Sequence, residues 1–163
     1  IGGVLDLLDS VKSCASPFGQ ANYVLCDRKE IADVELYEGG FARLPEEAQG
    51  YFLHTNHYIC GELLALNQHT LPTLIRDAHE ADSMPRLARI RELFQRMSGS
   101  ISVEGIQQAL SDHLNHPRSI CRHSSGSGSA VTVASIIAEP GEGRMRVCRG
   151  NPCTGTYHTY GFV

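Results

Sequence analysis

The chain of 163 residues is long enough to bury a core, and its hydrophobic content of 42% is typical of a globular protein, which excludes disorder over the whole chain. Its net charge of -4, with lysine and arginine scattered along the sequence, gives no basic surface for nucleic acid. The longest aliphatic segment, residues 131–138, is much shorter than the roughly 20 residues of a membrane-spanning helix. We therefore expect a soluble protein in which residues 1–163 form a single domain.

The N-terminal part predicts a helix followed by a hairpin. Apolar residues in the segment 1–14 recur at the spacing of a half-buried helix. Residues 21–40 contain two short apolar runs around a charged DRKE segment, which predicts a hairpin closed by a Gly-Gly pair. Asn22 stands ahead of the first run, where a buried polar side chain must find partners and would order the hairpin from within. A further strand is expected to lead through residues 51–54.

Two helices are predicted in the middle of the chain. Ser83 can cap a helix over residues 84–97, in which apolar side chains fall on one face and Pro85 is tolerated in the first turn. Ser102 can cap a second helix over residues 103–114, also with one apolar face.

The C-terminal part turns back to strands. Residues 129–140 and 144–150 predict two strands joined by a PGEG turn, and residues 156–163 predict a closing strand. Residues 123–130 have the Ser/Gly composition of a flexible surface loop. The order of helix, strands, helices and strands, with hairpin-type connections, favours an α+β layer fold over a βαβ fold.

The cysteines are spread through a chain that is large enough to fold without disulfides, so we expect reduced thiols and a cytoplasmic location. The six are Cys14, Cys26, Cys60, Cys121, Cys148 and Cys153.

Several signatures of common enzymes are missing, among them G-x-S-x-G, the Walker loop, G-x-G-x-x-G and H-E-x-x-H. The histidines that could suggest a metal fall in two clusters, which are His54 and His57, and His113, His116 and His123. The first two would face opposite sides of a strand, and the second cluster offers little beyond Asp112 as a further ligand. We therefore expect hydrogen-bonded or surface histidines and core thiols at Cys148 and Cys153, with no metal.

Two stretches need another explanation. They are LHTNHY at 53–58 and HLNHPRSICRHSSG at 113–126, the latter followed by TVASIIAEPGEGRMRVCRGNPC. Together with ANYVLCD and DVELYE earlier in the chain, they resemble in order and spacing the N-terminal-nucleophile hydrolases of the family that contains acyl-coenzyme A:6-aminopenicillanic acid acyltransferase (isopenicillin N acyltransferase) and the insect β-alanyl-amine hydrolases. The resemblance extends from Asn22 to Phe162.

The resemblance implies that this chain is the C-terminal portion of an αββα sandwich with antiparallel sheets. It also implies an enzyme made as a self-cleaving precursor, whose new N-terminal cysteine attacks a small-molecule amide or acyl donor and passes the acyl group to water or to an amine. The free α-amino group of such a cysteine can take the thiol proton. No metal or organic cofactor is implied.

By the resemblance, Asn56 donates to the oxyanion that forms on the attacked carbonyl, a task that suits a neutral amide; a turn-capping amide is the alternative. Arg122 is expected near the active centre, where it would bind a substrate carboxylate or hold the loop that carries the nucleophile. Its alternative is a structural ion pair with Asp112. Ser119 would assist there by hydrogen bonding, and His57 is a candidate substrate contact.

The nucleophile itself has no counterpart here. The family's cysteine opens the mature chain, whereas residue 1 is Ile and the first thiol, Cys14, lies at the end of the predicted N-terminal helix. We therefore expect the nucleophile upstream, in the remaining N-terminal part of the same precursor, whose strands would cover sheet edges left open here. This chain alone would be inactive. The rival interpretations are a non-catalytic binding domain on the same scaffold and a zinc-binding interaction module.

Overall fold

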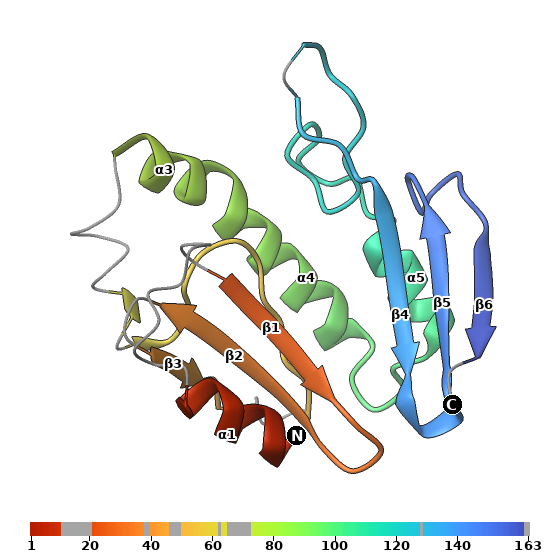
Figure 1. Cartoon of the computed structure of the whole chain (residues 1–163). Coiled ribbons are helices and arrows are strands. Elements are labelled where there is room, and N and C mark those ends of the chain that lie inside the picture. The colour runs from red at the N-terminus through yellow and green to blue at the C-terminus, as the bar shows by residue number, and fades with distance from the viewer. Residues whose placement is uncertain are drawn as a thin grey trace. The chain divides into compact units, whose positions relative to one another are not determined.

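The computed structural model describes residues 1–10, 21–37, 40–45, 50–61, 63–64, 73–127 and 129–161 (Figure 1). The chain divides into two compact units, Ile1–Ser83 and Met84–Val163, each with its own antiparallel sheet. The α+β class is thus confirmed, and the expectation of a single domain stays a prediction. None of the described helices combines the length and the apolar composition that crossing a membrane requires.

The sheet of the first unit consists of β1 (Ala21–Cys26), β2 (Ile31–Tyr37) and β3 (Gly40–Arg43), with β2 in the centre (Figure 1). The predicted hairpin is confirmed, because β1 and β2 pair antiparallel around the charged turn in the register Ala21↔Leu36 to Cys26↔Ile31. A second antiparallel pairing adds β3, which begins at the second glycine of the Gly-Gly pair; the first glycine lies outside the described residues.

The central strand β2 forms the core of this unit. Its residues Ala32, Asp33, Val34 and Glu35 are all fully buried. Because side chains alternate along a strand, the two carboxyl groups share one face of the sheet and the two apolar side chains share the other. Buried carboxyl groups need hydrogen-bond donors, and the segment that follows residue 53 supplies those of Glu35.

The strand predicted through residues 51–54 is wrong, because residues 50–60 contain no strand. Tyr51, Leu53 and Tyr58 are nevertheless buried. The backbone N–H groups of Ile59 and Cys60 bond to the side chain of a buried acid instead of to a neighbouring strand. The apolar pattern of residues 51–58 therefore indicated burial correctly but predicted the wrong backbone conformation.

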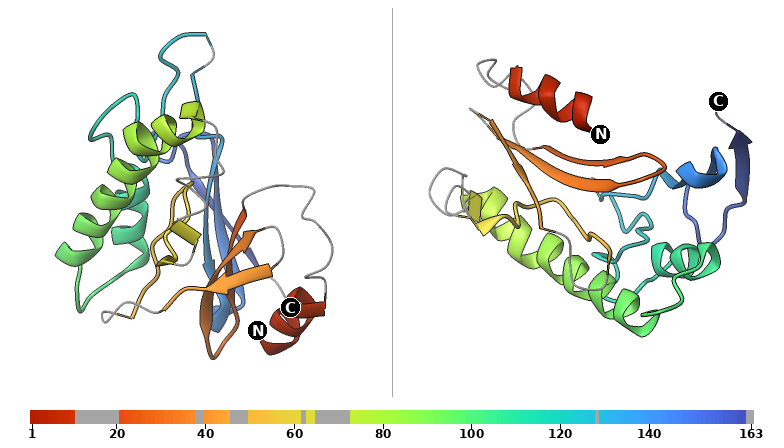
Figure 2. Two further views of the ribbon diagram at one scale, coloured as in Figure 1. Left: turned by 90° about the vertical axis from the view of Figure 1, so that its left-hand side faces the viewer. Right: turned by 90° about the horizontal axis from the view of Figure 1, so that it is seen from below.

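Helix α1 (Gly2–Ser10) confirms the start of the predicted N-terminal helix; residues 11–20 lie outside the described part. It lies beside the β1–β3 sheet (Figures 1 and 2). Helix α3 (Thr73–Ala78) and the π-helical turn η1 (His79–Ser83), which no pattern predicted, complete the described elements of this unit.

The second unit begins with α4 (Met84–Arg96), which confirms the predicted helix. Ser83 is not its cap, because Ser83 is itself helical. In contrast, Ser102 does cap α5 (Val103–Leu110), since its hydroxyl accepts a hydrogen bond of 3.1 Å from the N–H of Gly105. This helix ends four residues earlier than predicted.

Strands β4 (Ala134–Glu139), β5 (Arg144–Arg149) and β6 (Tyr157–Gly161) form the second sheet, with β5 in the centre (Figure 1). All three predicted C-terminal strands are thus confirmed, although β4 starts later than expected. The PGEG turn forms a short 3₁₀ helix closed by Gly143, whose φ of 62° lies in the left-handed region that favours glycine.

Candidate active site

The HTNHY segment forms the wall of a pocket of about 270 Å³ in the first unit. The pocket is lined by Ala21, Asn22, His54, Thr55, Asn56, His57 and Tyr58. Two of the four residues predicted for the site, Asn56 and His57, therefore lie in one cavity. Asn56 is exposed there, whereas His57 is 5% exposed.

Asn56 stands on a turn that is fastened to the end of the π-helical turn. Its backbone N–H donates to Oγ of Ser83 over 2.8 Å, and the Thr55 hydroxyl donates to the Ser83 carbonyl over 3.0 Å. Ser83 is only 2% exposed. The hydroxyl that looked like a helix cap in the sequence thus holds the turn that carries Asn56.

The hydroxyl of Ser83 also fixes the orientation of His57. This hydroxyl donates to the Thr55 hydroxyl over 3.0 Å, and Nδ1 of His57 lies 2.8 Å from Oγ of Ser83. With the single Ser83 proton directed to Thr55, Nδ1 of His57 must be the donor in the second contact. All three polar side chains are therefore tied into one network on one side of the pocket.

The other side of the turn is held by Glu35 from β2. Its Oε1 accepts from the N–H of Ile59 over 2.5 Å and lies 2.7 Å from Nε2 of His54, and its Oε2 accepts from the N–H of Cys60 over 3.1 Å. A buried carboxylate with three donors is well satisfied. Glu35 was not predicted as a functional residue. The signal that could have identified it is the alternation of acidic and apolar residues in the predicted strand DVELYE.

Both ring nitrogens of His54 face hydrogen-bond acceptors. Its Nδ1 lies 2.5 Å from the carbonyl oxygen of Thr55, and its Nε2 faces the Glu35 carboxyl group. With Glu35 ionised, neither acceptor has a proton to give, so both ring nitrogens carry one. Burial works to lower the pKa of His54, but the hydrogen bond to Glu35 and the charge of Asp33 raise it overall. Burial works to raise the pKa of Glu35, but the bonds from His54, Ile59 and Cys60 lower it overall.

Asn22, which also lines the pocket, is bonded to Asp33 of β2. The side-chain amide of Asn22 donates to Oδ1 of Asp33 across the hairpin, which confirms that Asn22 orders the hairpin from within. Oδ2 of Asp33 is buried and has no hydrogen-bond partner among the described residues. Burial raises the pKa of Asp33, because the charged form loses its hydration.

The other two predicted site residues belong to the second unit. The hydroxyl of Ser119, which is 1% exposed, donates to the carbonyl of Cys121, and Nε of Arg122 donates to the carbonyl of Ser119 over 3.3 Å. The backbone N–H of Arg122 donates to the Thr132 hydroxyl over 2.9 Å. Ser119 and the backbone of Arg122 therefore hold a loop together, and their contacts with substrate stay predictions.

The structural alternative for Arg122, an ion pair with Asp112, stays a prediction; the described partner of the Asp112 carboxylate is Arg89. Nε and Nη2 of Arg89 donate to its two carboxylate oxygens over 3.1 and 2.6 Å. The hydrogen bonds from Arg89 lower the pKa of Asp112. This bidentate pair joins α4 to the segment that follows α5.

The pocket can stabilise negative charge on a substrate, but its described lining does not offer a nucleophile. Asn56 supplies a neutral amide donor, and the lining residues named above include no cysteine. The Thr55 hydroxyl is engaged with Ser83. The described lining therefore supplies a hydrogen-bond donor for developing charge but no thiol.

Comparison with known families tests the resemblance seen in the sequence. Residues 4–154 match the family of acyl-coenzyme A:6-aminopenicillanic acid acyl-transferase. The chain belongs to this family. The match covers both units and all four predicted site residues, and it makes acyl transfer or amide cleavage the class of chemistry that the family implies. No curated protein matches the chain.

Proposed function

We propose that this chain is the C-terminal portion of a cysteine N-terminal-nucleophile hydrolase or acyltransferase that acts on small N-acyl amides or acyl thioesters. The observation that carries the proposal is the position of Asn56, exposed in a polar pocket on a turn that is fastened at both ends, in a chain of the acyltransferase family. The nucleophile is a cysteine thiol upstream of Ile1, exposed by self-cleavage of the precursor.

In the proposed mechanism, the upstream thiol attacks the substrate carbonyl while the α-amino group of the same cysteine takes the thiol proton. A C–S bond forms, and the carbonyl oxygen becomes an oxyanion that accepts a hydrogen bond from the Asn56 amide. Collapse of this intermediate breaks the C–N or C–S bond of the substrate, and the leaving amine or thiol takes the proton. Water or an acceptor amine then attacks the acyl-enzyme and regenerates the thiol.

The surroundings of Asn56 support this role because an oxyanion donor must be in place before charge develops. Ser83 holds the backbone of Asn56, and Glu35 holds the backbone two residues beyond His57. The donor can therefore act without reorganisation of the turn. His57 lines the same pocket and is proposed as a substrate contact, and Arg122 and Ser119 are kept as candidates for a carboxylate-binding group and its support.

The N-terminal part of the precursor is the proposed partner of the two sheets. Strands β1 and β4 are each at the edge of a sheet. Tyr23 and Val24 on β1 are 48% and 54% exposed, and Ile136 on β4 is 62% exposed. Apolar side chains on an unpaired edge strand favour the addition of further strands, which would complete the αββα sandwich.

The product of the full gene tests the proposal. We expect N-terminal sequencing and intact mass spectrometry to find a cut directly before a cysteine upstream of Ile1. Replacement of that cysteine by alanine should leave the precursor uncut. A protein that is not cut, or that has no upstream cysteine at a cut, would refute the proposed nucleophile and leave a non-catalytic binding domain as the function of the scaffold.

A further inference from the structure

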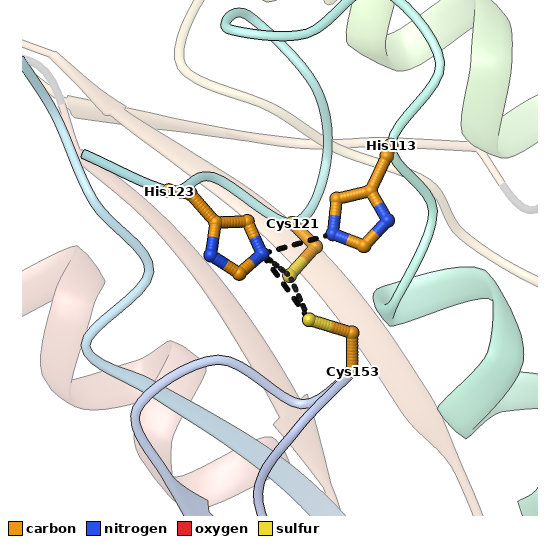
Figure 3. A group of neighbouring side chains, drawn as sticks. All are labelled: His113, Cys121, His123 and Cys153. Carbon is orange, nitrogen blue, oxygen red and sulfur yellow. Dashed lines mark hydrogen bonds between the residues drawn. The ribbon is translucent and has the colours of Figure 1, made fainter. Parts of the chain in front are cut away.

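Four potential metal ligands converge in the second unit. They are His113, Cys121, His123 and Cys153. One ligand atom from each lies within 4.8 Å of all the others, and the side chains point toward a common centre (Figure 3). The first three come from the segment that follows α5, and Cys153 comes from the turn between β5 and β6. In the sequence this set was hidden because Cys153 lies 30 residues beyond His123, the nearest of the other three.

Four of the six distances between the ligand atoms lie within about 0.4 Å of the edges of a zinc tetrahedron, and the other two are below 4.8 Å. Bond lengths of about 2.3 Å to sulfur and about 2.05 Å to nitrogen give edges of about 3.8 Å between two sulfurs, about 3.6 Å between nitrogen and sulfur and about 3.3 Å between two nitrogens. The two sulfurs are 3.6 Å apart. Nε2 of His123 lies 3.9 Å from Sγ of Cys121, 3.2 Å from Sγ of Cys153 and 3.0 Å from Nε2 of His113.

Hydrogen bonding alone accounts poorly for this cluster. All three other ligand atoms lie around Nε2 of His123, but a ring nitrogen can give or accept only one hydrogen bond in the ring plane. A disulfide between Cys121 and Cys153 would need the sulfurs about 2.05 Å apart and would leave both histidines unexplained. A cation at the centre would satisfy all four lone pairs at once.

The two segments that carry the ligands are held independently of the cluster. The N–H of Cys121 donates to the carbonyl of Asp112 over 2.9 Å, and Arg89 fixes the Asp112 side chain from α4. On the other segment, the N–H groups of Thr154 and Gly155 both donate to the carbonyl of Asn151, which forms a tight turn around Cys153.

Glycines and one amide complete the ligand turn. Gly150 has a φ of 79°, and a Cβ on Gly155 would lie 2.4 Å from Sγ of Cys148, so both positions require glycine. The side-chain amide of Asn151 donates to the carbonyl of Arg122 over 2.6 Å and to Sγ of Cys121 over 3.4 Å. Amide donors to a cysteine sulfur are typical of the groups that surround metal thiolates.

We propose that His113, Cys121, His123 and Cys153 bind one zinc ion as a structural site. Two thiolates and two imidazoles in tetrahedral arrangement are the ligand set that zinc prefers, and four protein ligands leave no open position for catalysis. The ion ties the segment after α5 to the β5–β6 turn. Because Arg122 lies between the ligands Cys121 and His123 in the sequence, the ion also fixes the backbone of Arg122. Only a benefit of this for catalysis rests on the proposed function.

Metal content and cobalt spectroscopy of the full protein, purified under reducing conditions without a histidine tag, test the proposal. We expect about one zinc per chain, and in zinc-depleted protein added Co²⁺ should give the visible bands of tetrahedral cobalt and a thiolate-to-cobalt charge-transfer band. Cys153→Ser and His113→Gln should lose the zinc and weaken or shift these bands. The controls Cys26→Ser and His116→Gln, at exposed positions outside the cluster, should keep both.

Three results would overturn the zinc site. They are protein without stoichiometric zinc that also gives no tetrahedral cobalt spectrum, a spectrum that Cys153→Ser leaves unchanged, and a Cys121–Cys153 disulfide in protein isolated anaerobically. Each is read without any enzyme assay, so the zinc site and the acyl-transfer proposal can fail separately. Should Cys153→Ser not fold, the single substitution His113→Gln at an exposed position provides the same test.

Discussion

Asn56→Ala in the processed enzyme is expected to lower kcat by about 100- to 1,000-fold, the usual effect of removing one oxyanion donor. The amide contributes only when charge develops on the carbonyl oxygen, so kcat should fall much more than KM rises. The substitution removes only the side chain of an exposed residue, and the backbone N–H that donates to Ser83 is retained. Steady-state kinetics with an acyl thioester and an amide substrate measure the effect.

The matched control is the stability of the same variant. Its urea unfolding midpoint should stay close to that of the unmodified enzyme, which separates a lost donor from a distorted pocket. Asn56→Asp should be at least as slow, because a carboxylate places a negative charge where the oxyanion forms. Full activity in Asn56→Ala would contradict the role of this residue and favour the turn-capping interpretation.

Glu35→Ala is expected to destabilise the first unit by about 3 to 5 kcal/mol, the range for breaking a buried ion pair from one side. The substitution leaves the His54 cation without its carboxylate and the N–H groups of Ile59 and Cys60 without their acceptor. Glu35→Gln should cost less, because it keeps the volume and one oxygen. The exposed control Glu142→Gln should change the free energy of unfolding little. Equal midpoints for all three variants in urea would refute this account of the pocket wall.

The ion pair also predicts how stability depends on pH. The pKa of Glu35 is lowered in the folded state, so its contribution is complete above its ordinary pKa of 4.5 and is lost as pH falls through the folded-state pKa. The pKa of His54 is raised, so its contribution is complete below its ordinary value of 6.5 and is lost as pH rises through the folded-state pKa. The stability difference between unmodified protein and Glu35→Gln should therefore be largest between pH 4.5 and 6.5.

Asp33 and Tyr58 are titratable groups that interact with this pair. The raised pKa of Asp33 gives a contribution that is complete below its ordinary value of 3.8 and is lost as pH rises, opposite to that of Glu35. Burial raises the pKa of Tyr58 to about 12, so Tyr58 stays neutral throughout this range. Both groups are kept in Glu35→Gln, but the charge of Glu35 helps to raise both of their pKa values. The difference between the two proteins therefore includes this effect on Asp33 as well as the pair itself.

Local patterns in the sequence were sufficient for most of the regular elements. The alternation and the charged turn between β1 and β2, the hydroxyl at Ser102 and the Pro-Gly turn before β5 each act over a few residues, and each appears in the structure. The order of motifs was also sufficient to identify the family, with Asn56 and Arg122 both inside the matched region.

Long-range contacts account for what the patterns missed. Residues 51–54 alternate between buried and half-buried positions as a strand would, but they form no strand, and the segment is held instead by Glu35, which accepts the backbone N–H of Ile59, 24 residues further along the chain. Ser83 is of a residue type that often caps helices, yet its hydrogen-bond partners are Thr55, Asn56 and His57 on a distant turn. The metal cluster likewise depends on a fold that brings Cys153 to His123. Such pairings leave no trace in local periodicity.

The most direct test of the central claim, that Asn56 serves an upstream thiol in acyl transfer, is intact mass spectrometry of the processed enzyme after brief exposure to N-acetylcysteamine thioesters. The account predicts an acyl adduct on the new N-terminal cysteine, which forms much more slowly in Asn56→Ala. An adduct on a cysteine within residues 1–163, or no adduct while substrate is consumed, would contradict it.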